Sequence, residues 1–153
     1  MGTLRFTEAL SGWMAAAEDH KAGYRAGRGA GAHVVKAGGI MIAAHPFRGF
    51  FVPGALPSVE EALSNPLFEL VDAVEVFNGV GSRREQDFAI EVVTRLSLPA
   101  VAGSDSHAPH TLGCCYTDFE RPLATVQDLV GELRSGRVKA VHPLLDLEFA
   151  RKV

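Results

Sequence analysis

The chain contains little cysteine and no long run of apolar residues. Its two cysteines, Cys114 and Cys115, are adjacent, and neighbouring cysteines rarely bridge without strain, so the sequence offers no disulfide framework. No apolar run approaches the length that crosses a membrane, and charged residues such as Arg5 and Glu8 interrupt the N-terminal segment where a secretory signal would lie. We therefore expect a reducing, cytoplasmic setting with no membrane attachment.

The sequence also has no excess of charge of one sign. Among 153 residues, 22% are charged, the formal net charge is −3 and the pI is about 6.0. A chain of this kind has no global electrostatic attraction to nucleic acid or to an anionic membrane. With 47% hydrophobic residues it can bury a real core, so we expect a single domain over residues 1–153.

Several common catalytic motifs are absent. There is no His-x-His, Cys-x-x-Cys or Gly-x-Ser-x-Gly pattern in the sequence. The glycines at 27, 29 and 31 precede no Lys-Ser or Lys-Thr and follow no predicted strand, so a phosphate-binding loop is not indicated there.

Short apolar runs alternate with segments of helical periodicity. Strands are predicted at 40–44, 73–77, 98–102 and 138–141, and a further strand is indicated at 114–119. Helices are predicted at 4–24, 32–37, 58–65, 82–96 and 125–134, with glycines between 23 and 31 loosening the chain. Capping boxes are predicted at Ser58 with Glu61 and at Ser82 with Glu85.

This order predicts an α/β fold with about three to five mostly parallel strands and flanking helices. A helical N-terminal region at 1–37 would precede a core of β/α units at 38–141, followed by a tail. A closed eight-stranded barrel needs about 250 residues, so the chain is too short to form one alone.

Polar residues with metal-binding chemistry follow two of the predicted strands. Asp105 and His107 come after strand 98–102, and His45 comes after strand 40–44 and before Pro46. In an extended chain, residues two apart point the same way, so Asp105 and His107 would stand side by side as a divalent metal site requires. Without a metal, Asp105 would cap a turn, His107 would be a surface histidine and His45 a satisfied core residue.

Three further residues lie near the same predicted strand ends. A guanidinium at Arg48 could bind a substrate phosphate, although a solvated loop arginine has the same sequence pattern. Glu75 interrupts an otherwise apolar strand, so it is either buried at a cost or faces a polar site. Asn78 with Gly79 could serve the site or form an ordinary turn.

Four blocks in this order resemble the PHP (polymerase and histidinol phosphatase) superfamily over residues 34–141. They are Gly-Gly-Ile-Met-Ile-Ala-Ala-His-Pro-Phe-Arg at 38–48, Val-Asp-Ala-Val-Glu-Val-Phe-Asn-Gly at 71–79, Val-Ala-Gly-Ser-Asp-Ser-His at 101–107 and Leu-Gly-Cys-Cys-Tyr-Thr-Asp-Phe at 112–119. The family folds as a distorted seven-stranded α/β barrel with two or three metals, zinc, manganese or iron, at the C-terminal strand ends.

The resemblance implies that His45, Asp105 and His107 are metal ligands. It also implies hydrolysis of phosphate esters by metal-activated water, with Asp105, His107 and Arg48 as the catalytic set. The substrate would be a phosphorylated small molecule or a nucleotide.

The chain departs from the family because no His-x-His pair lies upstream of His45. In family geometry the three matching ligands go to different metals, so each metal would keep about one protein ligand where a catalytic zinc usually has three. We therefore expect the C-terminal half of a PHP-like partial (β/α) barrel, weak or inactive alone, which self-associates or docks to an N-terminal PHP half. The alternatives are a non-catalytic metal-binding or protein-interaction module and the proofreading or structural PHP domain of a bacterial polymerase, which the short chain and the absence of basic character disfavour.

Overall fold

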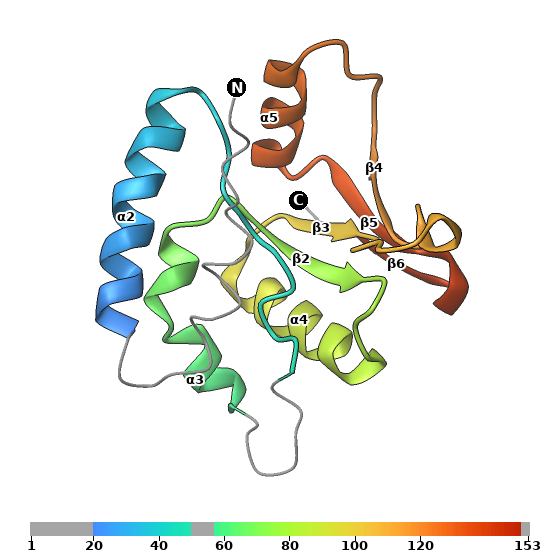
Figure 1. The fold of residues 1–153 in the computed structure, drawn as a ribbon, viewed down its shortest axis with the longest axis horizontal. Helices are drawn as coiled ribbons and strands as arrows, with labels where there is room; N and C mark the ends of the chain where they lie inside the picture. The colour runs from blue at the N-terminus through green and yellow to red at the C-terminus, as the bar shows by residue number, and fades with distance from the viewer. Residues whose placement is uncertain (1–19, 50–56, 151–153) are drawn as a thin grey trace.

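The computed structural model describes residues 20–49 and 57–150, with side chains from residue 27 onward (Figure 1). In chain order the elements are α2 His20–Lys36, β1 Ile42–Ala43, α3 Val59–Leu63, η1 Pro66–Glu69, β2 Ala73–Asn78, α4 Arg83–Leu96, β3 Ala100–Gly103, η2 Pro109–Thr111, β4 Tyr116–Phe119, α5 Val126–Ser135, β5 Val138–His142, η3 Pro143–Leu145 and β6 Leu147–Ala150. Most of the predicted helix at 4–24 lies outside the described residues.

The first three strands form a parallel sheet in the order β1-β2-β3. The central strand β2 reads Ala-Val-Glu-Val-Phe-Asn and is buried at every position except Glu75, which is partly buried. Such a continuous apolar run is typical of a parallel strand covered on both faces. Helix α4 lies along β2 (Figure 1), which confirms the predicted β-α-β order.

Two helices begin where the capping boxes predict. The Ser58 hydroxyl accepts the Glu61 backbone N–H at 3.2 Å, and the Glu61 carboxylate accepts the Ser58 N–H at 2.7 Å. The Ser82 and Glu85 pair repeats this arrangement at 3.3 and 2.7 Å at the start of α4. Each box pairs two backbone donors that a helix start would leave unbonded.

The expected break in the N-terminal helical region is wrong. Helix α2 runs without interruption through the glycines from Gly23 to Gly31, and the short helix predicted at 32–37 is its last turn and a half. Glycine weakens a helix but does not forbid it. A Cβ at Gly31 would lie 3.0 Å from the Met41 sulfur, so the missing side chain lets α2 approach the chain just before β1.

The expected tail is a second sheet. Strands β4, β5 and β6 pair antiparallel in that order, so the described fold has six strands and is mixed, where mostly parallel strands were predicted. The apolar side chains Leu147 and Phe149 alternate with exposed neighbours along β6 and pack on the core. This period of two is typical of a half-covered strand. Within the described residues, the two sheets do not close into a barrel.

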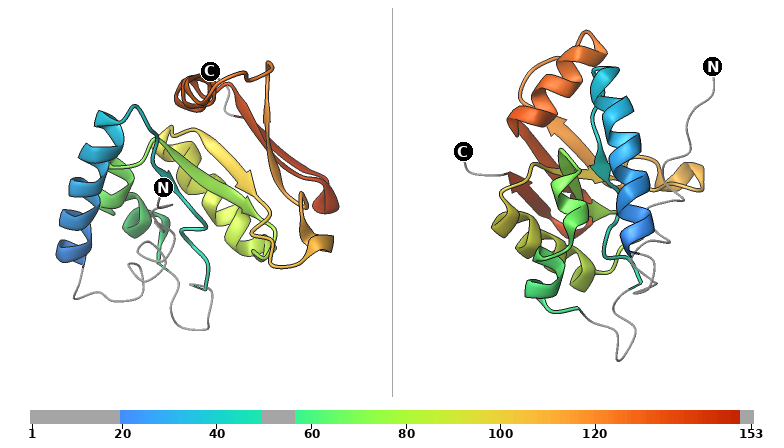
Figure 2. Two further views of the ribbon diagram at one scale, coloured as in Figure 1. Left: turned by 45° about the horizontal axis from the view of Figure 1, so that its top comes forward. Right: turned by 90° about the vertical axis from the view of Figure 1, so that its left-hand side faces the viewer.

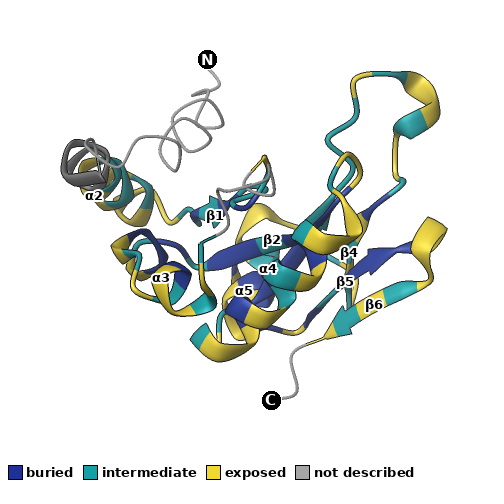
Figure 3. Cartoon of the chain, turned by 90° about the horizontal axis from the view of Figure 1, so that it is seen from below, coloured by how far each residue is buried: buried dark blue, intermediate teal, exposed yellow. Residues whose placement is uncertain are grey.

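The two sheets share one hydrophobic core. Cys115 and Ala140, next to or within the antiparallel sheet, belong to the same buried cluster as Val74 and Phe77 of β2. Figure 2 shows the antiparallel strands standing beside β3, and Figure 3 shows the buried residues running along β2 and β5. The antiparallel sheet therefore packs against the parallel sheet beside β3, the strand that leads to Asp105.

A single hydroxyl joins the edges of the two sheets. Thr117 Oγ1 on β4 accepts the Ala102 backbone N–H at 2.9 Å and donates to the Ala102 carbonyl at 3.0 Å. The side chain thus satisfies both polar groups that a neighbouring strand would otherwise bond. This contact fixes the end of β3 three residues before Asp105.

Thr117→Val should destabilise the chain by about 1–3 kcal/mol, because it leaves the part-buried N–H and carbonyl of Ala102 without a partner. Valine keeps the shape and β-branching of threonine, so the lost stability measures the contribution of the hydroxyl. Thr117→Ser keeps the hydroxyl and serves as the control. Urea unfolding of the three chains measures the difference, and equal midpoints for threonine and valine would show that the hydroxyl contributes nothing.

Candidate functional site

The strand-end residues gather at one edge of the parallel sheet. His45 lies two residues beyond β1, Asp105 lies two residues beyond β3, and Glu75 and Asn78 belong to β2 between them. The carboxyl ends of parallel strands meet at the same edge, which is where ligand sites of α/β sheets form. His45 and Asp105 therefore reach this edge of the sheet from two different strands.

The sequence predicted that Asp105 and His107 lie on an extended strand, and this prediction is wrong. Strand β3 ends at Gly103, and Asp105 has a left-handed backbone with φ 47°, so the alternation of an extended strand does not apply. The exposed His107 ring instead turns back, and its Nδ1 lies 2.8 Å from the Asp105 carbonyl oxygen. Aspartate tolerates this backbone region better than most residues do, so the turn presents its carboxylate without a glycine.

His45 also adopts a left-handed backbone, with φ 32°. The proline that follows disfavours an ordinary helical conformation, and His45 begins a turn in which the Arg48 backbone N–H donates to its carbonyl at 3.1 Å. Strained non-glycine residues persist only where the surrounding structure holds them in place, and they are common at functional sites. Here the Glu75 carboxylate accepts the His45 backbone N–H at 2.7 Å.

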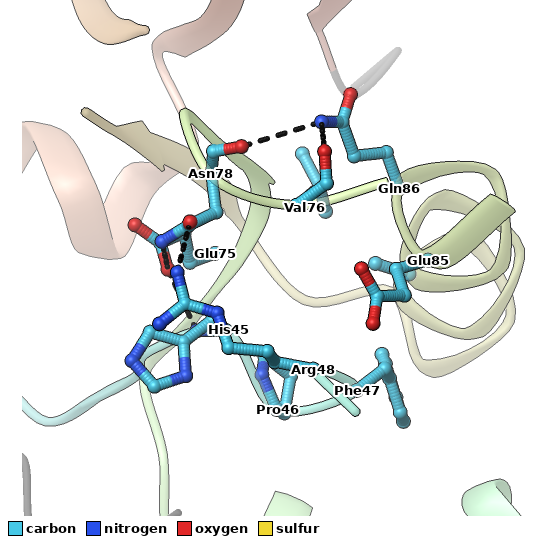
Figure 4. Close-up of a pocket in the computed structure, with 11 residues that line it drawn as sticks. His45, Pro46, Phe47, Arg48, Glu75, Val76, Asn78, Glu85 and Gln86 are labelled. Carbon is cyan, nitrogen blue, oxygen red and sulfur yellow. Dashed lines mark hydrogen bonds between the residues drawn. The ribbon is translucent and has the colours of Figure 1, made fainter. Parts of the chain in front are cut away.

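Arg48 connects the loops that follow β1 and β3. Its Nη2 donates to the Asp105 carboxylate and to the Asn78 side-chain oxygen, the latter at 2.6 Å; Figure 4 shows the guanidinium reaching past His45 to Asn78. Burial opposes the charged form of Asp105, but the hydrogen bond and charge of Arg48, with His45 and His107 nearby, outweigh it and lower the pKa of Asp105. Asp105 is therefore an ionised carboxylate at neutral pH.

Glu75 faces the polar site, which is one of the two outcomes the sequence left open. Its carboxylate accepts from the His45 backbone and from the Asn78 amide at 3.1 Å. Burial raises the pKa of Glu75 in spite of these hydrogen bonds. A Cβ at Gly103 would lie 2.6 Å from the Glu75 carboxylate, so the glycine beside it on β3 makes room for this partly buried acid.

Sequence reasoning missed Gln86. Its buried side-chain amide donates to the carbonyls of Asn78 at 3.3 Å and Gly81 at 3.0 Å, and so holds the turn that follows β2. The available signal was a polar residue at helical spacing from Ala89 and Val93 on the buried face of α4. Gln86 therefore positions the Asn78 side of the site.

The site offers the donor types of a divalent metal centre but too few of them in one place. No group of three His, Cys, Asp or Glu side chains arranged for a metal ion occurs among residues 27–49 and 57–150, whose side chains the structure describes. His45 Nδ1 is buried and has no hydrogen-bond partner in the described part of the chain, as suits a ligand atom. Asp105 supplies a carboxylate that already holds a cationic group. The donors fit a metal only if further ligands join them.

The family comparison covers the end of β3 and not the end of β1. Residues 83–138 match the family model described as PHP-associated. The matched segment runs from α4 to the start of β5 and includes Asp105 and His107, while His45 and Arg48 precede it. The predicted family resemblance is thus confirmed for this segment as a PHP-associated C-terminal domain.

One solved structure resembles part of the chain. The crystal structure of PsfC from Pseudomonas syringae PB-5123 is 26% identical over 61% of this chain, with a TM-score of 0.41. The matched region spans 36% of the PsfC chain, so this protein covers about a third of that relative. The search of curated proteins gives no match. No helix in the described part of the structure is long and apolar enough to span a membrane.

Proposed function

Since residues 83–138 form a PHP-associated segment, we propose that the chain is the C-terminal part of a PHP-like metal-dependent phosphoesterase. The parallel sheet β1-β2-β3 with α4 would be part of a PHP barrel that a second segment completes. The observation that carries the proposal is the convergence of His45, Glu75 and Asp105 at the carboxyl edge of this sheet.

Within this proposal each residue has a distinct role. His45, Asp105 and His107 are metal ligands, and a divalent metal there, zinc, manganese or iron, would supply activated water and neutralise phosphoryl oxygens. Arg48 provides a guanidinium that suits a phosphoryl group of a small molecule or nucleotide. Glu75, Asn78 and Gln86 hold the turns that carry these side chains.

The missing ligands would come from a second polypeptide segment. A catalytic zinc usually has three protein ligands, and the described residues do not assemble three. Strand β1, Ile42–Ala43, forms one edge of the parallel sheet. The backbone groups of a sheet edge can pair with further strands, so an N-terminal half-barrel would add its strands there. A second copy of the chain could cover the same edge but would bring no His-x-His pair.

The test is to complete the barrel. We expect a fusion of a PHP N-terminal half, carrying its His-x-His pair, to this chain to hydrolyse p-nitrophenyl phosphate or its diester when Mn²⁺ is present. Asp105→Asn in the same fusion should abolish this activity. Arg83→Gln, which removes an arginine from the exposed Arg83–Asp87 pair on α4, should leave it unchanged.

The second candidate function is a non-catalytic module that retains the scaffold. It is favoured by the absence of a three-ligand group in the described residues and by the occupation of Asp105 by Arg48. A correctly folded fusion that shows no metal-dependent hydrolysis of either ester would favour this module and contradict the enzyme.

A further inference from the structure

Arg48 occupies the position beside Asp105 where a bound cation would lie. One guanidinium nitrogen, Nη2, bonds both Asp105 Oδ2 and Asn78 Oδ1. The two side chains are only 34% and 23% exposed, so water screens their charges less than it would at the surface. The ion pair therefore competes effectively with other cations for this carboxylate.

The arginine is not fully satisfied in this position. Its Nε is buried and has no hydrogen-bond partner within the described residues, and an unmet buried donor costs free energy. The His45 Nδ1 is likewise buried and has no hydrogen-bond partner within the described residues. An arrangement in which Arg48 leaves Asp105 would let water or a ligand reach both atoms.

We propose that Arg48 is an internal cation that holds Asp105 until a divalent metal displaces it. The inference rests on the proposed function, because it assumes that Asp105 is a metal ligand. A guanidinium and a divalent ion repel each other and share the same carboxylate oxygens, so the two occupy Asp105 in alternation. Arg48 then keeps the affinity of the isolated chain for metal low and becomes free to face an anionic ligand once metal is bound.

The experiment is a titration of the isolated chain with Mn²⁺, followed by the electron paramagnetic resonance signal of the free ion. Manganese prefers carboxylate and other oxygen ligands to thiolate, so Cys114 and Cys115 do not interfere. Arg48→Gln keeps a polar side chain beside Asn78 but removes the positive charge, and it should bind Mn²⁺ about tenfold more tightly than the unaltered chain. Arg48→Met provides a second test without the amide.

Matched variants separate displacement from a general charge effect. Arg83→Gln changes the net charge equally but frees the exposed carboxylate of Asp87 on α4 instead of that of Asp105, and it should leave the affinity unchanged. Adding Asp105→Asn to Arg48→Gln should remove the gain. Circular dichroism and urea unfolding confirm that each variant is folded, and a folded Arg48→Met decides the question if Arg48→Gln is not.

The outcomes also distinguish this inference from the proposed function. Equal Mn²⁺ affinity in the unaltered chain and both Arg48 variants, or no binding in any of them, would overturn the proposed displacement of Arg48 by metal. The proposed function would survive either result if the barrel fusion hydrolyses phosphate esters. Tighter binding in Arg48→Gln that persists with Asp105→Asn would also contradict the inference, because the metal would then lie elsewhere.

Discussion

Gly79→Ala should destabilise the folded chain by about 3 kcal/mol or more, the largest loss expected from removing or adding a single carbon. A Cβ at Gly79 would lie 2.3 Å from the Cys114 sulfur and 2.4 Å from the Ser104 carbonyl oxygen. The Ser104 oxygen belongs to the backbone and cannot turn aside. The Gly79 N–H also donates to the Gly103 carbonyl at 3.1 Å, so the segment is held where the clash occurs.

The clash would separate the turn after β2 from the loop that carries Asp105. A matched control is Gly131→Ala on α5, where no atom lies within 4 Å of the added carbon and alanine should stabilise the helix by up to about 1 kcal/mol. Urea unfolding of both variants gives the comparison. A Gly79→Ala chain as stable as the unaltered chain would mean that the two loops do not approach as closely as the structure shows.

Gly103→Ala should have the second largest effect, with a loss of about 2 kcal/mol. The added carbon would lie 2.6 Å from the Glu75 carboxylate and would push it away from the His45 N–H and the Asn78 amide. The register of β2 with β3 shifts between Glu75 and Phe77, so the contact lies beside an irregularity of the sheet. The variant should therefore disturb the site as well as the fold.

A double-mutant cycle with Glu75→Ala isolates this contact. Glu75→Ala alone leaves the His45 N–H unpaired and is itself destabilising, but in that background Gly103→Ala meets no carboxylate and should cost little. The expected coupling is about 1–2 kcal/mol, measured from the four unfolding free energies. Additive losses would show that Gly103 is not needed to make room for the Glu75 carboxylate.

Local signals in the sequence predicted much of the parallel half of the fold. The Ser58 and Ser82 capping boxes place two helix starts at the observed residue, because the bonds that define a box involve neighbours within three residues. The apolar runs locate β2 and β3 within a few residues. The strand β6 was missed because its alternation is short and acquires meaning only when β5 supplies a partner.

The site was predicted in outline and not in its contacts. Strand order alone places His45 and Asp105 at one edge, since parallel strands share a direction. The ion pair of Arg48 with Asp105 joins residues 57 positions apart, and no local pattern indicates it. The left-handed backbone at Asp105 likewise depends on how the following loop folds back. The close packing of Gly103 on Glu75 also requires two strands in register.

The most direct test of the account is the metal content of the completed barrel fusion, purified with Mn²⁺ and measured by elemental analysis. Asp105→Asn and His45→Asn are suitable variants, because asparagine tolerates the left-handed backbone that both positions adopt and should leave the fold intact. His107→Asn completes the set. The account predicts that the unaltered fusion retains metal and that each folded variant loses it. Unchanged metal content in the folded variants would contradict the assignment of His45, Asp105 and His107 as ligands.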